Sequence, residues 1–303
     1  MKMRVLISGG RGLIGTALTK SLLADGHSIW ALTRREPESI PATKGLTFVH
    51  WDGHTPYGWG DIVSDMDAVV NLAGENLARW PWTKKQKHRF WDSRVNAGQA
   101  LTAAIRTASP RPKVLIQASG INYYGTLGGT ADESTPPGDD FLACLTVAWE
   151  EATKEMESLG VRRCIVRQGV VLAPQGGLFS LMALPVRLFA GGPLGSGKQA
   201  VPWVHLDDVV GAIHFLLEND QTSGVYNLIA PEAISNADFY RALAQALHRP
   251  YWFRTPAFLL KLALGEMSVL VVEGRCATPN RLLEAGYRFQ VEELGEAMKR
   301  LVG

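Results

Sequence analysis

The sequence has few cysteines and no long hydrophobic run, and these two absences exclude several classes of protein. Cys144, Cys164 and Cys276 are too far apart in the chain to give a metal-binding spacing or a disulfide framework. No apolar stretch is long enough to cross a bilayer, and a strand pattern begins so early that it leaves no room for a signal peptide. We therefore expect a cytoplasmic protein without membrane segments.

A surplus of one charge is also missing. The 303 residues include 31 Lys and Arg and 29 Asp and Glu, which gives a formal net charge of +2 at pH 7. This balance offers no broad attraction to nucleic acid or to an acidic membrane. Trp80 and Trp82 lie beside Lys84, Lys85 and Lys87. Because there is no second basic cluster, we interpret this segment as a lid or partner-facing surface rather than a nucleic-acid site.

What the sequence does contain is a glycine-rich turn near its start. An apolar strand over Arg4–Ser8 leads into three regularly spaced glycines and then into an apolar helix. In α/β proteins this arrangement holds the pyrophosphate of a dinucleotide, because glycine permits the tight turn and a close approach of backbone, while the helix N-terminus is positive. The residues of this turn that we expect to contact a cofactor are Gly9, Gly12, Leu13, Ile14 and Gly15.

Strand and helix patterns alternate along the first two-thirds of the chain, which predicts a parallel sheet with helices on both faces. We expect an α/β fold: a Rossmann-type doubly wound parallel sheet over residues 1–172 and a smaller C-terminal substrate lobe over 173–303. A strand over Tyr226–Ile229 can belong to either part. The strands predicted for the first part are Arg4–Ser8, Ser28–Thr33, Thr47–Trp51, Asp67–Leu72, Lys113–Ser119 and Arg162–Arg167.

Helical patterns fill most of the remaining chain, and glycine-rich loops separate them after residue 172. His205, Asp207 and Asp208 stand where one helix opens. Their spacing suits a metal site or a catalytic dyad, but we interpret the two aspartates as residues that cap the helix and complement its dipole. The predicted helices run from Leu13 to about Gly26, from Thr83 to Ala108, and over Phe141–Gly160, Leu206–Asn219, Asn236–Leu247, Pro256–Leu264 and Val291–Leu301.

The end of the second strand indicates which nicotinamide cofactor fits. Arg34 lies 19 residues after Gly15, where NAD-binding proteins carry an acidic residue for the ribose hydroxyls. A guanidinium instead favours a 2′-phosphate, through a charge-assisted hydrogen bond worth about 1.5–3 kcal/mol. We therefore predict NADP(H). Two observations compete with this prediction: Glu36 can still reach a ribose hydroxyl, and Arg34 with Arg35 can simply solubilise a strand end.

Several segments resemble motifs of the extended short-chain dehydrogenase/reductases. Asn71–Gly74 is similar to that family's Asn-Ala-Ala-Gly segment, Trp203–Val209 to its Val-His-Val-Asp-Asp segment, and Gly224–Leu228 to its Gly-x-Tyr-Asn strand. Within the NAD-dependent epimerase/dehydratase superfamily, the chain resembles the atypical "epimerase family protein" or YfcH-like group almost from end to end. The segments that carry this narrower resemblance are Asn71–Asn76, Ser93-Arg94, Tyr123–Gly125, Arg167–Leu172, Gly191–Gly197 and a C-terminal piece over about 250–297.

The resemblance implies an NADP(H) cofactor and a role for each matching residue. Thr33 and Arg34 would hold the 2′-phosphate, and Arg94 would reach a phosphate. Arg94 also lies in a helix rich in basic residues, where a solvated face is the alternative interpretation. Apart from the resemblance, the position of Asp52 at the end of the third strand suggests a contact with adenine. The residues expected to line the cofactor near the nicotinamide are Leu72, Ala73, Gly74 and Val171.

The Tyr-x-x-x-Lys pair of the typical extended enzyme is missing. Aligned on Trp149, the tyrosine position falls near Leu142 and the lysine position near Thr146. Neither residue can move a proton as a lysine-assisted tyrosine does. The substitutes that we predict are Ser119 and Tyr123, with a packing role as the alternative for the tyrosine.

Two functions therefore stay open. The first is an NADP(H)-dependent oxidoreductase or epimerase that uses an unusual acid on an unknown small molecule. The second is an NADPH-binding sensor or scaffold that does no chemistry. Neither requires a metal or a nucleic acid, and a homodimer is the assembly that the resemblance suggests.

Overall fold

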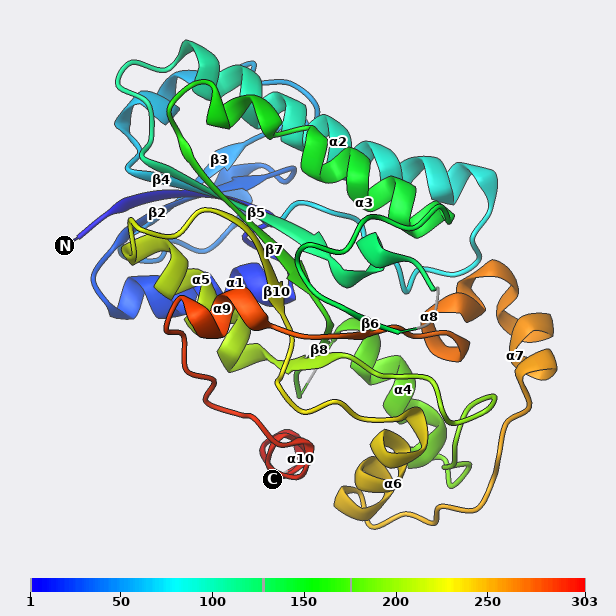
Figure 1. Ribbon diagram of the computed structural model, residues 1–303. Coiled ribbons are helices and arrows are strands. Elements are labelled where there is room, and N and C mark those ends of the chain that lie inside the picture. Colours follow the sequence, from blue (N-terminus) through cyan, green and yellow to red (C-terminus); the bar gives the residue numbers. More distant parts are fainter. Residues whose placement is uncertain (1, 127–128, 175, 303) are drawn as a thin grey trace.

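The computed structural model describes residues 2–126, 129–174 and 176–302 and is built on a seven-stranded parallel sheet (Figure 1). The strand order is β10-β7-β5-β4-β1-β2-β3, so the direction of winding reverses between β1 and β4. This reversal confirms the predicted doubly wound, Rossmann-type sheet, and ligands bind such sheets at the carboxyl ends beside the reversal. The strands are β1 (Arg4–Ser8), β2 (Ser28–Thr33), β3 (Leu46–His50), β4 (Ala68–Asn71), β5 (Val114–Gly120), β7 (Arg162–Gln168) and β10 (Gly224–Leu228).

Both faces of the sheet are covered by helices, as the alternation along the chain predicts. Successive residues of a strand point to opposite faces. Val5 and Ile7 of β1 are buried in one core, whereas Leu6 between them is buried in the other. The helices on the first face are α1 (Leu13–Ala24), α5 (Leu206–Glu218) and α9 (Asn280–Glu284), and those on the second are α2 (Lys84–Thr107) and α3 (Phe141–Glu151) (Figure 1).

The chain after residue 172 builds one edge of the main sheet as well as a smaller lobe. β10 pairs with β7, so the strand expected over Tyr226–Ile229 belongs to the main sheet. The lobe has its own core, in which Phe179, Trp203 and Phe239 are buried. Its elements are β8 (Val170–Leu172), β9 (Trp203–His205), α4 (Gly177–Arg187), α6 (Asn236–Ala246) and α10 (Leu294–Val302).

The remaining elements are a short two-stranded ladder, two further helices and several 3-10 turns. β6 (Thr130–Ala131) pairs with β11 (Cys276–Ala277), which ties the C-terminal segment to the loop after β5. Within the described ranges, no helix combines the length and apolarity needed to cross a membrane. The other helices are α7 (Ala257–Leu264) and α8 (Val269–Val272), with 3-10 turns at Pro37–Ser39, Gly60–Asp65, Ile121–Tyr124, Lys154–Glu157 and Gly265–Ser268.

The helix predicted over Phe141–Gly160 is shorter than expected, because α3 ends at Glu151. Arg163 of β7 donates a hydrogen bond of 2.8 Å from Nη1 to the Glu150 carbonyl. The Thr153 hydroxyl lies 3.3 Å from the same oxygen. These bonds take up an acceptor that a continuing helix would use, and the chain tightens into the 3-10 turn at Lys154–Glu157.

The cap of α5 corrects a second expectation. His205, not either aspartate, is the N-cap, and its Nδ1 accepts a hydrogen bond of 3.2 Å from the Asp207 backbone N–H. Asp208 is buried instead, and it accepts from the backbone of Gln290 and Val291. Both aspartates do lie in the first turn, where negative charge suits the helix dipole.

This cap predicts a loss of stability in mild acid. Nδ1 can accept a hydrogen bond only in the neutral imidazole, and burial lowers the pKa of His205 from 6.5, an effect that Asp207 offsets only in part. The unfolded chain therefore binds more protons, so this contribution is present above about pH 6.5 and is lost as the pH falls. We expect His205→Asn, which caps without titrating, to flatten the decrease in unfolding free energy between about pH 7 and 5 by about 1 kcal/mol in urea titrations.

Candidate functional site

The glycine turn between β1 and α1 is too tightly packed for a larger residue at Gly9 or Gly15. A Cβ added to Gly15 would lie 2.2 Å from the Gly9 carbonyl oxygen, and one added to Gly9 would lie 2.5 Å from the Leu72 oxygen. Gly9 also has a φ of +71°, which favours glycine. The turn therefore brings the backbone of β1, α1 and the end of β4 into direct contact.

No side chain among the described residues caps the first backbone N–H groups of α1. Gly12 is its N-cap and offers no side-chain hydrogen bond, and the first turn carries no acidic residue. The first backbone N–H groups of a helix have no partner within it, and they carry the positive end of the helix dipole. Arg11 and Lys20 line the same pocket and add two positive charges. This end of the site is suited to an anion such as a pyrophosphate.

The turn opens into a pocket of about 1170 Å³ that runs along the carboxyl ends of the central strands. Drug-sized ligands occupy cavities of roughly 300–1,000 Å³, so this one has room for a dinucleotide and a second molecule. The structure brings most of the predicted site residues together in its wall: Gly9, Gly12, Leu13, Ile14, Gly15, Leu72, Gly74, Arg94, Ser119 and Val171.

Five predicted residues do not line this pocket: Thr33, Arg34, Asp52, Ala73 and Tyr123. Arg34 is exposed at the end of β2, and none of the described residues makes a hydrogen bond or ion pair with its guanidinium. Gly53 lies beside its side chain. Thr33 is buried, and its hydroxyl accepts a hydrogen bond of 3.2 Å from the Arg35 N–H. Glu36 lies 3.9 Å from His50. The predicted contacts of Thr33 and Arg34 with a 2′-phosphate stay predictions.

Asp52 and Ala73 are engaged within the protein. The carboxylate of Asp52 accepts hydrogen bonds from the backbone of His54 and Thr55 and from the Thr55 hydroxyl. Desolvation opposes the charge of Asp52, but these hydrogen bonds prevail and lower its pKa. The Ala73 N–H donates to the Asn71 side chain at 3.2 Å. A contact of Asp52 with adenine stays a prediction.

Arg94 lines the pocket but is held by backbone carbonyls. Its Nη1 donates to the Phe90 oxygen at 3.1 Å and its Nη2 to the Glu75 oxygen at 3.0 Å. The guanidinium also lies 4.9 Å from the ring centre of Trp149, and burial lowers the pKa of Arg94 to about 10. These contacts position the turn after β4, and any contact with a phosphate must use the remaining N–H groups.

The side chains that α3 presents to the pocket cannot replace the missing Tyr-x-x-x-Lys pair. Leu142 and Thr146, the positions expected for the tyrosine and the lysine, both line the pocket. The Thr146 hydroxyl donates to the Leu142 carbonyl at 2.7 Å, so it is engaged within its own helix. Among the described residues in the wall there is no Tyr, His or Cys. The described residues also contain no group of three or more metal-ligating side chains.

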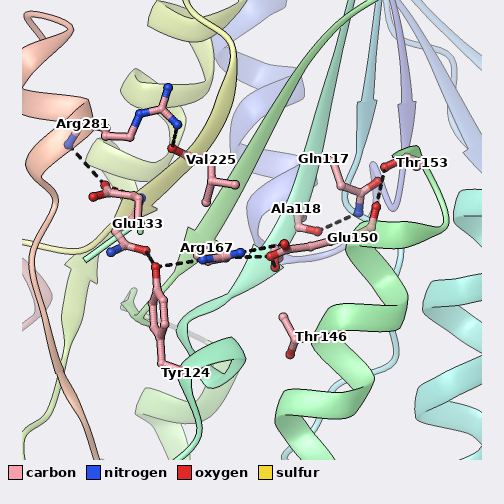
Figure 2. Close-up of polar contacts among 12 residues, drawn as sticks. Gln117, Ala118, Tyr124, Glu133, Thr146, Glu150, Thr153, Arg167, Val225 and Arg281 are labelled. Carbon is pink, nitrogen blue, oxygen red and sulfur yellow. Dashed lines mark hydrogen bonds and ion pairs between the residues drawn. The ribbon is translucent and has the colours of Figure 1, made fainter. Parts of the chain in front are cut away.

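Ser119 is the end of a buried polar chain that reaches the pocket. Its hydroxyl donates a hydrogen bond of 2.6 Å to Glu150, whose two carboxylate oxygens are each 2.8 Å from nitrogens of Arg167. Figure 2 shows the part of this chain that Glu150, Arg167 and Tyr124 form. Burial opposes the charge of Arg167, but the hydrogen bonds and charge of Glu150 outweigh it and raise its pKa. Arg167 in turn donates to the Tyr124 hydroxyl at 3.0 Å.

Tyr123 packs against Arg167 of these hydrogen-bonded residues and does not line the pocket. Its ring packs under the guanidinium of Arg167, with 3.3 Å between Cζ and the ring centre. It also meets Tyr124 edge to face at 5.4 Å. The packing role that was the alternative for this tyrosine fits its position, and its catalytic role stays a prediction.

Sequence reasoning missed several residues in the wall. Arg11 and Lys20 had a usable signal, because one lies within the glycine turn and the other on the helix that follows it. Val271 lies on α8, and Gln199 and Arg275 lie in loops far from it in the chain, so only the folded chain brings the three residues to the pocket.

The model of the "NAD dependent epimerase/dehydratase family" matches residues 5–228. This chain belongs to that family. A second family model, "Domain of unknown function (DUF1731)", matches residues 255–301. The first match extends over the strands of the main sheet, and the second extends over the C-terminal segment that contains α7, α8, β11, α9 and α10.

Relatives of similar length match the chain from end to end in sequence. The chain is 36% identical over 304 residues to the epimerase family protein YfhF of Bacillus subtilis, covering 99% of this chain and 98% of the relative. It is 38% identical over 307 residues to the human epimerase family protein SDR39U1, covering 99% and 100%. The predicted "epimerase family protein" group is confirmed, with YfhF and SDR39U1 in place of the narrower YfcH-like label.

A crystal structure of human SDR39U1 (isoform 2) with NADPH superposes with a TM-score of 0.87 at 35% identity, covering 99% of each chain. The similarity therefore extends over the sheet, the lobe and the C-terminal segment.

Proposed function

We propose that this protein binds NADP(H) in the described pocket and is an oxidoreductase that acts on a second, small molecule. The carrying observation is that one cavity joins the unpartnered N-terminus of α1 to Ser119 and has room for both molecules. The human relative crystallised with NADPH supports the choice of cofactor. The bound cofactor supplies hydride exchange, and the protein supplies binding and orientation.

The residues proposed to hold the cofactor come from three strand ends. Backbone N–H groups of Leu13, Ile14 and Gly15, with Arg11 and Lys20, bind the pyrophosphate. The exposed guanidinium of Arg34 binds the 2′-phosphate beyond the enclosed pocket. The backbone at Leu72 and Gly74 lies along the ribose on the nicotinamide side.

Ser119 is proposed to contact the oxygen of the substrate. Its proton is donated to Glu150, so its lone pairs can accept a hydrogen bond from a substrate hydroxyl. During oxidation the substrate's hydroxyl proton would move to Ser119 Oγ while the Ser119 proton moves to Glu150. Moving a proton onto Glu150 would remove one charge of the buried Glu150–Arg167 ion pair, so we expect this proton transfer, and hence turnover, to be slow.

A non-catalytic NADPH-binding sensor or scaffold is the second candidate. The absence of Tyr, His and Cys from the described pocket wall favours it. Capture of a partner protein only in the presence of NADPH would support this candidate, whereas oxidation of bound NADPH by a metabolite would count against it.

The Ser119→Ala variant tests the reaction. Absorbance of reduced nicotinamide, followed across a panel of aldehydes, ketones, quinones and sugar nucleotides, should identify a substrate. The variant should then turn over at least about 100-fold more slowly, since positioned acid–base groups contribute 10²–10⁴-fold. Its NADPH affinity should stay within about threefold. Ser158→Ala, at an exposed serine remote from the pocket wall, is the matched control. No turnover of any compound would leave the sensor as the function, and full activity of Ser119→Ala would refute the role of Ser119.

The Arg34→Met variant tests the choice between NADP(H) and NAD(H). Loss of a charge-assisted hydrogen bond should weaken NADPH binding about tenfold to hundredfold and leave NADH binding unchanged. Calorimetric titration measures both affinities. Arg241→Met, at an exposed arginine that pairs with Asp238 on α6, is the control. An unchanged ratio of the two affinities in Arg34→Met would show that Arg34 does not read the 2′-phosphate.

A further inference from the structure

Three of the charged groups at the substrate end of the pocket are engaged within the protein, whereas Glu273 and Arg275 form no ion pair with the described residues. Glu75 accepts from Arg79 at 2.7 Å and from Gln86 at 2.9 Å. Asp140 caps α3 through the N–H groups of Leu142 and Ala143. Arg94 is held by the two carbonyls described above. The charged groups that are still able to contact a ligand therefore come from the C-terminal segment, which closes this end of the pocket.

Arg275, on the approach to β11, lines the pocket with most of its guanidinium unused. Its Nη1 donates to the Tyr124 carbonyl at 2.7 Å. Its Nε is buried without a hydrogen-bond partner among the described residues, and no described carboxylate forms an ion pair with it. The Nε and Nη2 edge of a guanidinium is the edge that binds a carboxylate or phosphate with two parallel hydrogen bonds.

The backbone holds Arg275 firmly in this position. Before it, Gly274 packs so closely that an added Cβ would lie 2.0 Å from the Ala200 oxygen. After it, Cys276 pairs with Thr130 in the β6–β11 ladder. The Tyr124 that accepts from Arg275 is itself fixed, because its hydroxyl donates to Asn227 at 2.7 Å. The cation is thus preorganised, which lowers the cost of binding a ligand.

A buried donor without a partner is costly to the folded protein unless a ligand satisfies it. Much of the remaining wall at this end is apolar, with Leu142, Leu145, Trp149 and Val269, but it also contains the carboxylate of Glu273, two residues before Arg275. A molecule that fits both features has an apolar body and one anionic group. Building on the NADP(H)-dependent function proposed above, we infer that Arg275 binds the carboxylate or phosphate of the substrate, which is therefore an anionic compound.

Matched probes test this inference without knowledge of the substrate. Phenylacetate, phenyl phosphate and the neutral phenylacetamide would be titrated calorimetrically into the protein with and without NADPH. We expect at least one anionic probe to bind about tenfold or more tightly than the amide. The stronger of the two anions distinguishes carboxylate from phosphate as the recognised group.

The variants assign the preference to one side chain. Arg275→Met should reduce the preference to less than about threefold, Arg275→Lys should keep part of it, and Arg241→Met should keep all of it. NADPH affinity should stay within about threefold in all of them, which also shows that they fold. Equal binding of anionic and neutral probes, no binding of either anion, or a preference that survives in Arg275→Met would overturn the inference.

The same titrations separate this inference from the proposed function. An Arg275-dependent preference for anions in a protein that does not bind NADPH would leave the anion site standing and refute the cofactor. Tight NADPH binding without that preference would support the cofactor and refute the anion site at Arg275.

Discussion

Replacing Gly15 with alanine is expected to abolish NADP(H) binding. A Cβ at this position would lie 2.2 Å from the Gly9 carbonyl oxygen and 2.6 Å from the Gly10 Cα. Both contacts are with backbone, so relief requires the helix to move away from the turn that would hold the pyrophosphate. A displacement of this kind removes several charge-assisted hydrogen bonds at once, and the loss of affinity should exceed about 100-fold.

Gly295→Ala provides the matched control. Gly295 lies in α10, where an added Cβ would meet nothing within 4 Å. Alanine is the better helix former by about 1 kcal/mol, so this variant should be slightly stabilised and should bind NADPH normally. Fluorescence titration with NADPH compares the two variants. Binding by a folded Gly15→Ala protein at wild-type affinity would contradict the site described here.

Replacing Arg167 with methionine is expected to lower the free energy of unfolding by about 3–5 kcal/mol, because it leaves a buried carboxylate uncompensated. The Arg167 and Glu150 side chains are only 3% and 9% exposed. Arg167 also donates to Tyr124, whose hydroxyl donates to Asn227 of β10. Urea unfolding followed by circular dichroism measures the loss.

The double variant Glu150→Gln with Arg167→Met separates the buried charge from the packing. Glutamine is neutral and can still accept from Ser119, so the double variant should recover at least half of the stability that Arg167→Met loses. A loss below about 1 kcal/mol in the single variant would mean that Glu150 is protonated or hydrated when Arg167 is absent, and the buried ion pair would not be what holds Ser119.

The main sheet could be predicted because its determinants are local. The strand over Ser28–Thr33 and the start of α1 at Leu13 follow from apolar runs bounded by glycine and polar residues, and the structure confirms both. The parallel sheet with helices on both faces follows from the alternation of strand and helix patterns.

The remaining differences arise from tertiary contacts that no short segment encodes. α3 stops at Glu151 because Arg163 of a neighbouring strand takes the Glu150 carbonyl. α5 begins at Leu206 as predicted, so the N-cap position falls on His205 and not on Asp207 or Asp208, although aspartate has the higher preference for a cap.

The candidate site divides in the same way. Its phosphate-binding half depends on the glycine turn, which is a contiguous motif, and most of the predicted residues there do line the pocket. Its other half gathers Ser119, Gln199 and Arg275 from separate parts of the chain. The side chains in that half, which bear on the reaction, could not be assembled before the fold was known.

Calorimetric titration of the purified protein with NADPH and with NADH tests the central proposal most directly. The account predicts one site per chain that binds NADPH at least about tenfold more tightly than NADH. Equal or tighter binding of NADH would contradict the role given to Arg34. No binding of either nucleotide would contradict the assignment of this pocket as a dinucleotide site.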